Sequence, residues 1–138
     1  MTRARTFIDS GVLIMAARGT DEISDRALAV LGDPNREFIT SDFVRLEVLP
    51  KAIFHRQKAE MEFYEAFLGD CGTTIESCGE LVEKAFGEAQ AAGLSAVDSL
   101  HVAAAREGGC VELITAEKKE KPLFRVAGLR VSTIRDGS

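Results

Sequence analysis

The sequence of 138 residues contains no tryptophan, one tyrosine and three cysteines. Proteins that hold single-stranded nucleic acid by stacking its bases use aromatic side chains, so the shortage of Trp and Tyr argues against a broad stacking platform. The cysteines, at positions 71, 78 and 110, are odd in number and show no C-x-x-C spacing. This argues against both a disulfide framework and a zinc site. We therefore expect a reducing, cytoplasmic environment.

Long apolar runs and several common site motifs are also missing. No stretch approaches the roughly 18 apolar residues that a membrane-spanning helix needs, and the N-terminus has no apolar signal-peptide segment. We expect no membrane association. The patterns G-x-G-x-x-G, G-x-x-x-x-G-K-[ST] and G-x-S-x-G do not occur. Dinucleotide-binding, P-loop and serine-hydrolase sites are therefore without support.

Acidic residues outnumber basic ones by 22 to 17, which gives a formal charge of −5 at pH 7. This balance argues against a non-specific coat for duplex DNA, because such a coat needs a broad basic face. It leaves nucleic acid open as a substrate. If the four site acids proposed below are set aside, 18 acids remain against 17 basic residues. Most of the excess negative charge would then lie in one pocket.

Short apolar runs alternate with helical patterns along the whole chain. The runs typical of strands cover residues 6–8, 37–40, 73–75, 111–115 and 129–134. Helical spacing of apolar residues occupies residues 12–17, 21–31, 42–55, 58–68, 81–92 and 95–106. We expect Pro50 to kink or break the third of these helices. The alternation predicts an α/β fold in one domain over residues 1–138, with three α/β/α layers and a mainly parallel central sheet of four to five strands.

Four acidic residues occupy positions that such a fold would bring together. Asp9 directly follows the run 6–8, and Glu117 follows the run 111–115 by two positions. Asp98 lies in the first turn of the helix 95–106, and Glu47 interrupts an otherwise apolar helical pattern. Ligands bind at the carboxyl ends of parallel strands. We therefore predict that these four acids share one cleft as catalytic residues.

Each acid also has a purely structural explanation. Asp9 could cap the next helix by accepting a backbone N–H, and Asp98 completes the capping-box pattern that Ser95 begins. Glu47 could point to solvent. Glu117 could be a first-turn acid that the helix dipole favours. Only their common position at one edge of the sheet favours a shared site.

Several carboxylates within about 4 to 6 Å raise one another's pKa unless a cation is present. Oxygen ligands select Mg²⁺ or Mn²⁺ over zinc, so we predict such an ion bound by Asp9, Glu47 and Asp98, with Glu117 assisting. Ser10 and Thr115 would orient carboxylates or waters from outside the ligand set. A site of this kind suits hydrolysis of phosphodiester bonds.

Basic residues follow the last of these acids directly, at Lys118, Lys119 and Lys121. They would form a basic edge that binds RNA phosphates; the alternative is a solvated surface run. The position of His101, three residues after Asp98, places both on one face of the helix. We expect His101 to be packed or hydrogen-bonded rather than a metal ligand or a general base.

On these residues the sequence resembles the PIN-domain nucleases, and within them the VapC-like toxin ribonucleases. The family's strand ending in Asp and followed by Ser or Thr is matched by FIDSGVLI at 7–14. Its helical Glu is matched by RLEVL at 45–49, and its third acid by LSAVDSLHVAAA at 94–105. Two positions depart from the family pattern: Glu117 stands where Asp is usual, and Gly11 where a polar residue is frequent.

The resemblance implies a Mg²⁺- or Mn²⁺-dependent endoribonuclease that is the toxin of a type II toxin–antitoxin pair. It further implies RNA as the substrate, a small antitoxin as a partner and a homodimer. The extra methylene of Glu117 would let its carboxylate act through a water. The alternative hypothesis is a non-catalytic or weakly active PIN-like module that binds RNA or protein, with a metal site weakened at Glu117 and Gly11.

Overall fold

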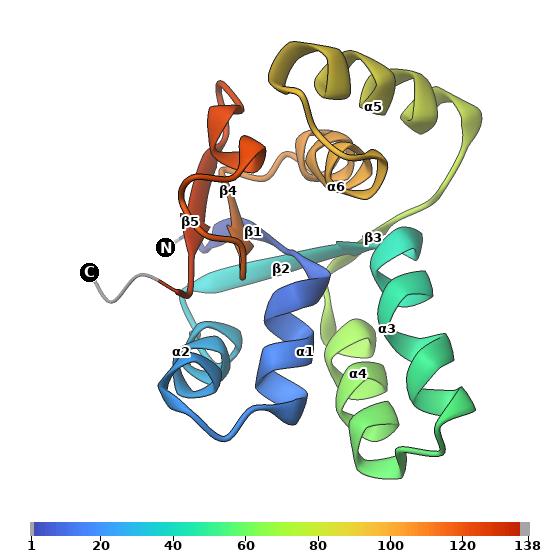
Figure 1. The fold of residues 1–138 in the computed structure, drawn as a ribbon, viewed down its shortest axis with the longest axis vertical. Coiled ribbons are helices and arrows are strands. Elements are labelled where there is room, and N and C mark those ends of the chain that lie inside the picture. The colour runs from blue at the N-terminus through green and yellow to red at the C-terminus, as the bar shows by residue number, and fades with distance from the viewer. Residues whose placement is uncertain (1, 136–138) are drawn as a thin grey trace.

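The computed structural model describes residues 2–135 and consists of a five-stranded sheet between two layers of helices (Figure 1). In chain order the elements are β1 (Ala4–Ile8), α1 (Ser10–Arg18), α2 (Glu22–Leu31), β2 (Arg36–Ser41), α3 (Asp42–Phe54), α4 (Lys58–Asp70), β3 (Thr73–Ile75), α5 (Gly79–Ala92), α6 (Ala96–Glu107), β4 (Glu112–Thr115), the 3₁₀ helix η1 (Pro122–Arg125) and β5 (Arg130–Thr133). The predicted three-layer α/β/α fold is confirmed, and the strand predictions agree with the observed strands to within two residues at each end.

The sheet has the strand order β3-β2-β1-β4-β5, and all four neighbouring pairs are parallel. Phe7 in the central strand pairs with Ile39 of β2 on one side and with Leu113 of β4 on the other. From β1 the chain first builds one half of the sheet and then returns to build the other. Such a reversal leaves a crevice at the carboxyl ends of the two strands that flank it, here β1 and β4.

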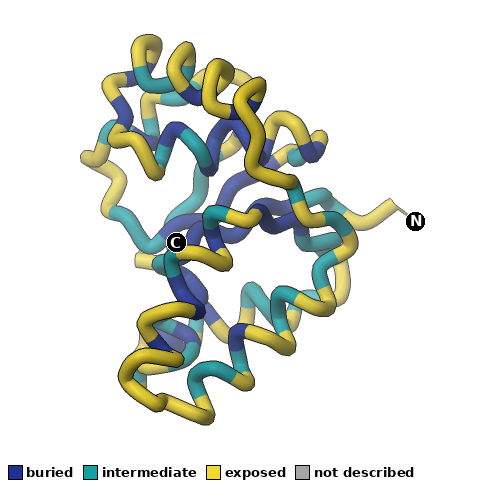
Figure 2. The backbone as a smooth tube through the Cα atoms, turned by 90° about the vertical axis from the view of Figure 1, so that its right-hand side faces the viewer, coloured by how far each residue is buried: buried dark blue, intermediate teal, exposed yellow. Residues whose placement is uncertain are grey.

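The helices cover the two faces of the sheet unequally. Helices α1 to α4 lie on one face, and α5 and α6 lie on the other (Figure 1). The backbone is buried along the sheet, whereas the outer turns of the helices are exposed (Figure 2). Ala103, Ala104 and Ala105 are all buried on α6. Their small side chains let α6 pack closely on β1, β2 and β4.

Helix α3 runs through Pro50 from Asp42 to Phe54, so the helix is not broken there. Proline has no N–H to donate to the carbonyl of Leu46 one turn earlier. Both Pro50 and Leu46 are exposed, so this carbonyl lies on the solvent side of the helix, where water can hydrate it. Among the residues that the structure describes, no helix is long and apolar enough to cross a membrane.

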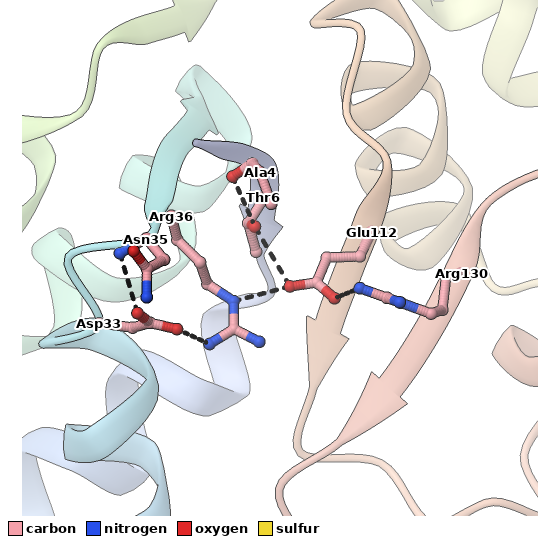
Figure 3. Close-up of polar contacts among 7 residues, drawn as sticks. All are labelled: Ala4, Thr6, Asp33, Asn35, Arg36, Glu112 and Arg130. Carbon is pink, nitrogen blue, oxygen red and sulfur yellow. Dashed lines mark hydrogen bonds and ion pairs between the residues drawn. The ribbon is translucent and has the colours of Figure 1, made fainter. Parts of the chain in front are cut away.

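A buried carboxylate ties the amino ends of the strands together (Figure 3). Glu112, at the start of β4, accepts hydrogen bonds from Arg36 Nε at 2.7 Å, Arg130 Nη2 at 2.5 Å and Thr6 Oγ1 at 3.2 Å. Arg36 also donates to Asp33 Oδ2 at 2.7 Å. Burial raises the pKa of Glu112, but the bonds from the two arginines outweigh burial and the pKa is lowered. This cluster lies at the opposite end of the sheet from the crevice between β1 and β4.

Candidate active site

Asp9 lies directly after β1, and only 8% of the residue is exposed. Its Oδ2 accepts a hydrogen bond from Thr115 Oγ1, at the end of β4, at 2.7 Å. No hydrogen bond links its side chain to the first turn of α1, although Asp9 occupies the N-cap position. The capping explanation therefore fails for this carboxylate, which lies across the crevice between β1 and β4.

Glu47 reaches the same crevice from α3. Its Oε1 accepts a hydrogen bond from Ser10 Oγ at 2.5 Å and lies within hydrogen-bond distance of His101 Nε2, at 2.7 Å. One ligand atom from each of Asp9, Glu47 and His101 lies within 4.8 Å of the other two. The Glu47 side chain is 36% exposed. It is therefore held at the site on one side and open to solvent on the other, rather than free in solvent.

Hydrogen bonds decide the ionisation of the pair that Glu47 and His101 form. Burial raises the pKa of Glu47, but the hydrogen bonds from His101 and Ser10 outweigh burial and the pKa is lowered. Burial lowers the pKa of His101, but the bond to Glu47 and the nearby charge of Asp9 raise it overall. Glu47 is therefore held as a carboxylate.

Asp98 approaches the site from the first turn of α6. Its backbone N–H donates to Ser95 Oγ at 3.2 Å, so the predicted capping box contributes to the start of the helix. Its carboxyl group has a second environment, because burial and the charges of Asp9 and Glu117 together raise its pKa. Asp98 is thus both a capping residue and an acid that faces other acids.

Glu117 follows β4 and is half-buried, with its backbone N–H donating to Thr115 Oγ1 at 3.0 Å. Asp98 and Glu117 do not belong to the close group of Asp9, Glu47 and His101. The structure therefore brings all four predicted acids to one end of the sheet, but in two sets: Asp9 and Glu47, which belong to the close group with His101, and Asp98 and Glu117, which do not.

A hollow of 440 Å³ lies beyond Glu117; three basic residues, Lys118, Lys119 and Arg135, and one acidic residue, Glu120, are among those that line it, so we call it the basic hollow. Lys121 is not among the lining residues and precedes η1. Arg135 Nε donates to the backbone carbonyl of Ala116, which anchors it beside the end of β4. Arg135 was not among the residues predicted from the sequence. The usable signal was that the last predicted strand ends one residue earlier, at the same edge of the sheet.

A second hollow, of 320 Å³, opens on the other side of Glu47 between α1, α3 and α4. Glu47, Lys51, Arg18 and Tyr64 are among the residues that line it. The positive charge of Lys51 contributes to the lowered pKa of Glu47. Arg18 is paired with Glu60 at 2.8 Å. Basic side chains therefore border the acidic crevice on two sides.

Glycine at position 11 is explained by close packing, which the sequence pattern did not predict. A Cβ atom built on Gly11 would lie 3.1 Å from the Cβ of Ala116. Any larger residue would press on the segment that leads from β4 to Glu117. Glycine therefore lets α1 and this segment approach each other at the crevice.

The family model of the PIN domain matches residues 6–129 of the sequence. This chain belongs to the PIN domain family. Among the curated proteins, no sequence matches at a significant level. The predicted resemblance is therefore confirmed by the family match, and solved structures extend it at the level of the fold.

This PIN domain is similar to several solved toxin–antitoxin proteins. The VapBC2 structure from Rickettsia felis, bound to a DNA fragment from its promoter, matches with a TM-score of 0.69 at 15% identity, over 94% of this chain and 98% of that one. A toxin–antitoxin complex from Klebsiella pneumoniae gives 0.66 at 19% identity, over 90% and 94%. VapC20 from Mycobacterium tuberculosis, a toxin that cleaves the sarcin–ricin loop, gives 0.62 at 18% identity, over 78% and 86%. At these identities the likeness establishes the shared fold.

Proposed function

We propose that this PIN domain is a Mg²⁺- or Mn²⁺-dependent endoribonuclease and the toxin component of a type II toxin–antitoxin pair. One observation carries the proposal: Asp9 and Glu47 bring carboxylate oxygens within 4.8 Å of each other at the carboxyl end of a parallel sheet, where burial and the charges of Asp9 and Glu117 also raise the pKa of Asp98. Acids placed so that they repel one another are stabilised by a cation. The similar fold of a toxin that cleaves RNA supports RNA as the substrate.

The side chains present fit a divalent metal ion. Asp9 and Glu47 offer carboxylate oxygens within 4.8 Å of each other, and Asp98 adds a third carboxylate beside them. Oxygen donors suit Mg²⁺ and Mn²⁺. We propose that Asp9, Glu47 and Asp98 hold the ion. When bound, such an ion activates water for attack on a phosphodiester and offsets the charge that develops on the phosphate.

The other residues of the site hold these carboxylates in place. Thr115 donates to Asp9, and Ser10 donates to Glu47. The charge of Glu117 contributes to the raised pKa of Asp98, so the two carboxyl groups lie near each other. We propose that Glu117 assists as the fourth acid. Groups that orient ligands in this way commonly affect metal affinity or activity about 10- to 100-fold.

An RNA-cleavage assay of the wild type and Asp98→Asn, each in Mg²⁺, Mn²⁺ and chelator, tests the function. We expect the wild type to cleave in either metal and not in chelator. Asp98→Asn should lose more than about 100-fold in rate, because it removes a direct ligand rather than a supporting group. It keeps the backbone N–H that bonds to Ser95, so circular dichroism should show an unchanged fold.

A wild type that binds RNA but cleaves none of a panel of RNAs in either metal would support the alternative, a non-catalytic binding module. Equal cleavage rates for the wild type and Asp98→Asn would remove Asp98 from the site.

The basic hollow beside Glu117 is proposed to bind RNA phosphates through Lys118, Lys119 and Arg135, with Lys121 nearby in the chain. Each phosphate contact to single-stranded RNA contributes about 0.7 to the slope of log K against log salt. Lys118→Ala and Arg135→Ala are each expected to lower that slope by about this amount. Fluorescence anisotropy in chelator, in the Asp98→Asn background, measures binding without cleavage.

Lys84→Ala is the matched control for these two variants. Lys84 is on α5 and is ion-paired with Glu107 and Glu80, on the opposite face of the sheet from α1 to α4. Its removal should leave the salt slope unchanged. If Lys118→Ala and Arg135→Ala behave like Lys84→Ala, the RNA lies elsewhere.

We also propose a small antitoxin protein as a partner, a homodimer as the assembly and the cytoplasm as the location. The similarity in fold to proteins solved as toxin–antitoxin complexes supports the proposal that an antitoxin binds this chain. Helix α3 leaves large apolar side chains exposed, with Leu46, next to Glu47, at 65%, and Ile53 at 51% and Phe54 at 80% near the end of the helix. Apolar side chains gathered on a surface favour contact with another protein. A neighbouring gene for a small basic protein would support the pair.

A further inference from the structure

We infer that His101 is a positioning residue for the proposed metal site: its Nε2–H donates to Glu47, and the ring is not itself a metal ligand. The inference rests on the proposed function, since it assigns a role beside the carboxylates that would hold the ion. The distances alone allow either role, because ligand atoms of His101, Asp9 and Glu47 all lie within 4.8 Å of one another and could share one metal ion. The surroundings of the two ring nitrogens together decide between them.

His101 is enclosed by the core, with 2% of the residue exposed. One side of its ring packs against Phe7, with the ring centroids 5.6 Å apart. Nε2 faces the site, 2.7 Å from Glu47 Oε1, 3.6 Å from Asp9 Oδ1 and 3.5 Å from Ser10 Oγ. Within residues 2–135, Nδ1 is buried and has no hydrogen-bond partner.

The unpartnered Nδ1 argues against ligation through Nε2. A histidine that binds a metal through one nitrogen carries its proton on the other, and almost always donates it to a carboxylate, a carbonyl or a water. For His101 that proton would be on Nδ1, where no acceptor among the described residues receives it. Nδ1 lacks a partner in either tautomer, but only a proton on Nε2 supplies a donor to the Glu47 carboxylate oxygen 2.7 Å away; without that proton, two acceptors would face each other. The arrangement therefore favours the proton on Nε2.

With its proton on Nε2, His101 fixes one oxygen of Glu47 and leaves the other available. Oε1 already accepts bonds from both His101 and Ser10. None of the hydrogen bonds among the described residues uses Oε2 of Glu47, and the side chain keeps solvent access. His101 thus occupies Oε1 of Glu47 and leaves Oε2 free of hydrogen bonds to the described residues. Since His101 and Asp98 share α6, that helix supplies one proposed ligand and orients a second.

The ¹⁵N chemical shifts of the imidazole ring test this assignment directly. The chain has only two histidines, so His55→Gln identifies the signals of His101. We expect His101 Nε2 to carry its proton in the metal-free protein and to keep it when Mg²⁺ is added. The inference is overturned if Mg²⁺ removes the proton from Nε2 and places it on Nδ1. It is also overturned if Nε2 is unprotonated in the metal-free protein.

Two substitutions separate a donor from a ligand. His101→Gln keeps an N–H that can reach Glu47, whereas His101→Leu removes it. Calorimetry should show Mg²⁺ affinity near that of the wild type in His101→Gln and about 10- to 100-fold weaker in His101→Leu. The ratio of Mn²⁺ to Mg²⁺ affinity should be the same in the wild type and His101→Gln. Since a nitrogen ligand favours Mn²⁺ over Mg²⁺, a fall in this ratio in His101→Gln would instead identify His101 as a ligand.

His55→Gln serves as the control for both measurements, because His55 is exposed at the end of α3. Circular dichroism verifies that each variant is folded. If the wild type binds no Mg²⁺, the proposed function fails, whereas the metal-free spectrum still reports whether Nε2 donates to Glu47. The effect of Glu47→Gln on the His101 signals supplies that answer: a shifted Nε2 signal supports the contact, and an unchanged one overturns it.

Discussion

Asp9→Asn is expected to stabilise the metal-free protein and to abolish Mg²⁺-dependent cleavage. Asp9 is nearly buried, and its charge contributes to the raised pKa of Asp98. A carboxyl group whose pKa is higher in the folded than in the unfolded state destabilises the fold at pH values above both pKa values. Asparagine removes the charge and keeps an oxygen that can accept the bond from Thr115. The free energy of unfolding at pH 7 in chelator should therefore be higher in Asp9→Asn than in the wild type.

Urea unfolding with and without Mg²⁺ measures both halves of this prediction. The free energy of unfolding of the wild type should rise by about 2.7 kcal/mol when the free Mg²⁺ concentration is 100 times the dissociation constant. Asp9→Asn should gain nothing from Mg²⁺ and should lose more than about 100-fold in cleavage rate, because a proposed ligand is gone. Asp70→Asn, at the exposed end of α4, is the control and should change stability by less than about 0.5 kcal/mol.

The dependence on pH provides a further check. In the metal-free wild type, stability should fall as the pH rises through the elevated pKa of Asp98, because the folded state then holds a repelling charge. Asp9→Asn should flatten that fall. A destabilised Asp9→Asn in chelator would show instead that the bond from Thr115 fully compensates the buried carboxylate.

The fold was predictable because apolar runs alternate with helical patterns over most of the chain, and such alternation is compatible with few topologies. The order of the strands did not follow from pattern alone. β1 lies between β2 and β4 because the chain adds β2 and β3 on one side of β1 and then β4 and β5 on the other. Local secondary-structure propensity does not specify on which side of the sheet the next strand is added. Yet the reversal is what places Thr115 beside Asp9 and so defines the crevice.

The candidate site was predictable where the signal lies at a strand end, and not where it depends on helices crossing. Asp9 and Glu117 each follow a strand of a parallel sheet, so it could be inferred from the sequence that both lie at the edge formed by the carboxyl ends of the strands. The contact between Glu47 and His101 joins residues 54 positions apart on α3 and α6. Its formation depends on how closely α6 packs on the sheet, which is a property of the assembled core. For the same reason the sequence suggested a packed histidine without naming its partner.

The largest loss of stability is expected for Glu112→Gln, at the end of the sheet opposite the crevice. The side chain of Glu112 is 2% exposed and joins Arg36, Arg130 and Thr6 (Figure 3). Neutralising one member of a buried ion pair leaves the other charges without compensation. Arg36 is 24% exposed and keeps Asp33, which moderates the loss. We expect Glu112→Gln to lower the free energy of unfolding by about 2 to 3 kcal/mol at pH 7.

The loss should depend on pH in a way that identifies its electrostatic cause. The pKa of Glu112 is lower in the folded state, so its contribution is present above the unfolded-state pKa of about 4.3 and disappears as the pH falls through the folded-state value. Urea unfolding from pH 7 to pH 3 should therefore show the wild type and Glu112→Gln converging at low pH. Glu62→Gln, an exposed substitution on α4, should differ little from the wild type throughout. A difference between the wild type and Glu112→Gln that stays constant down to pH 3 would assign the loss to packing and not to the ion pairs.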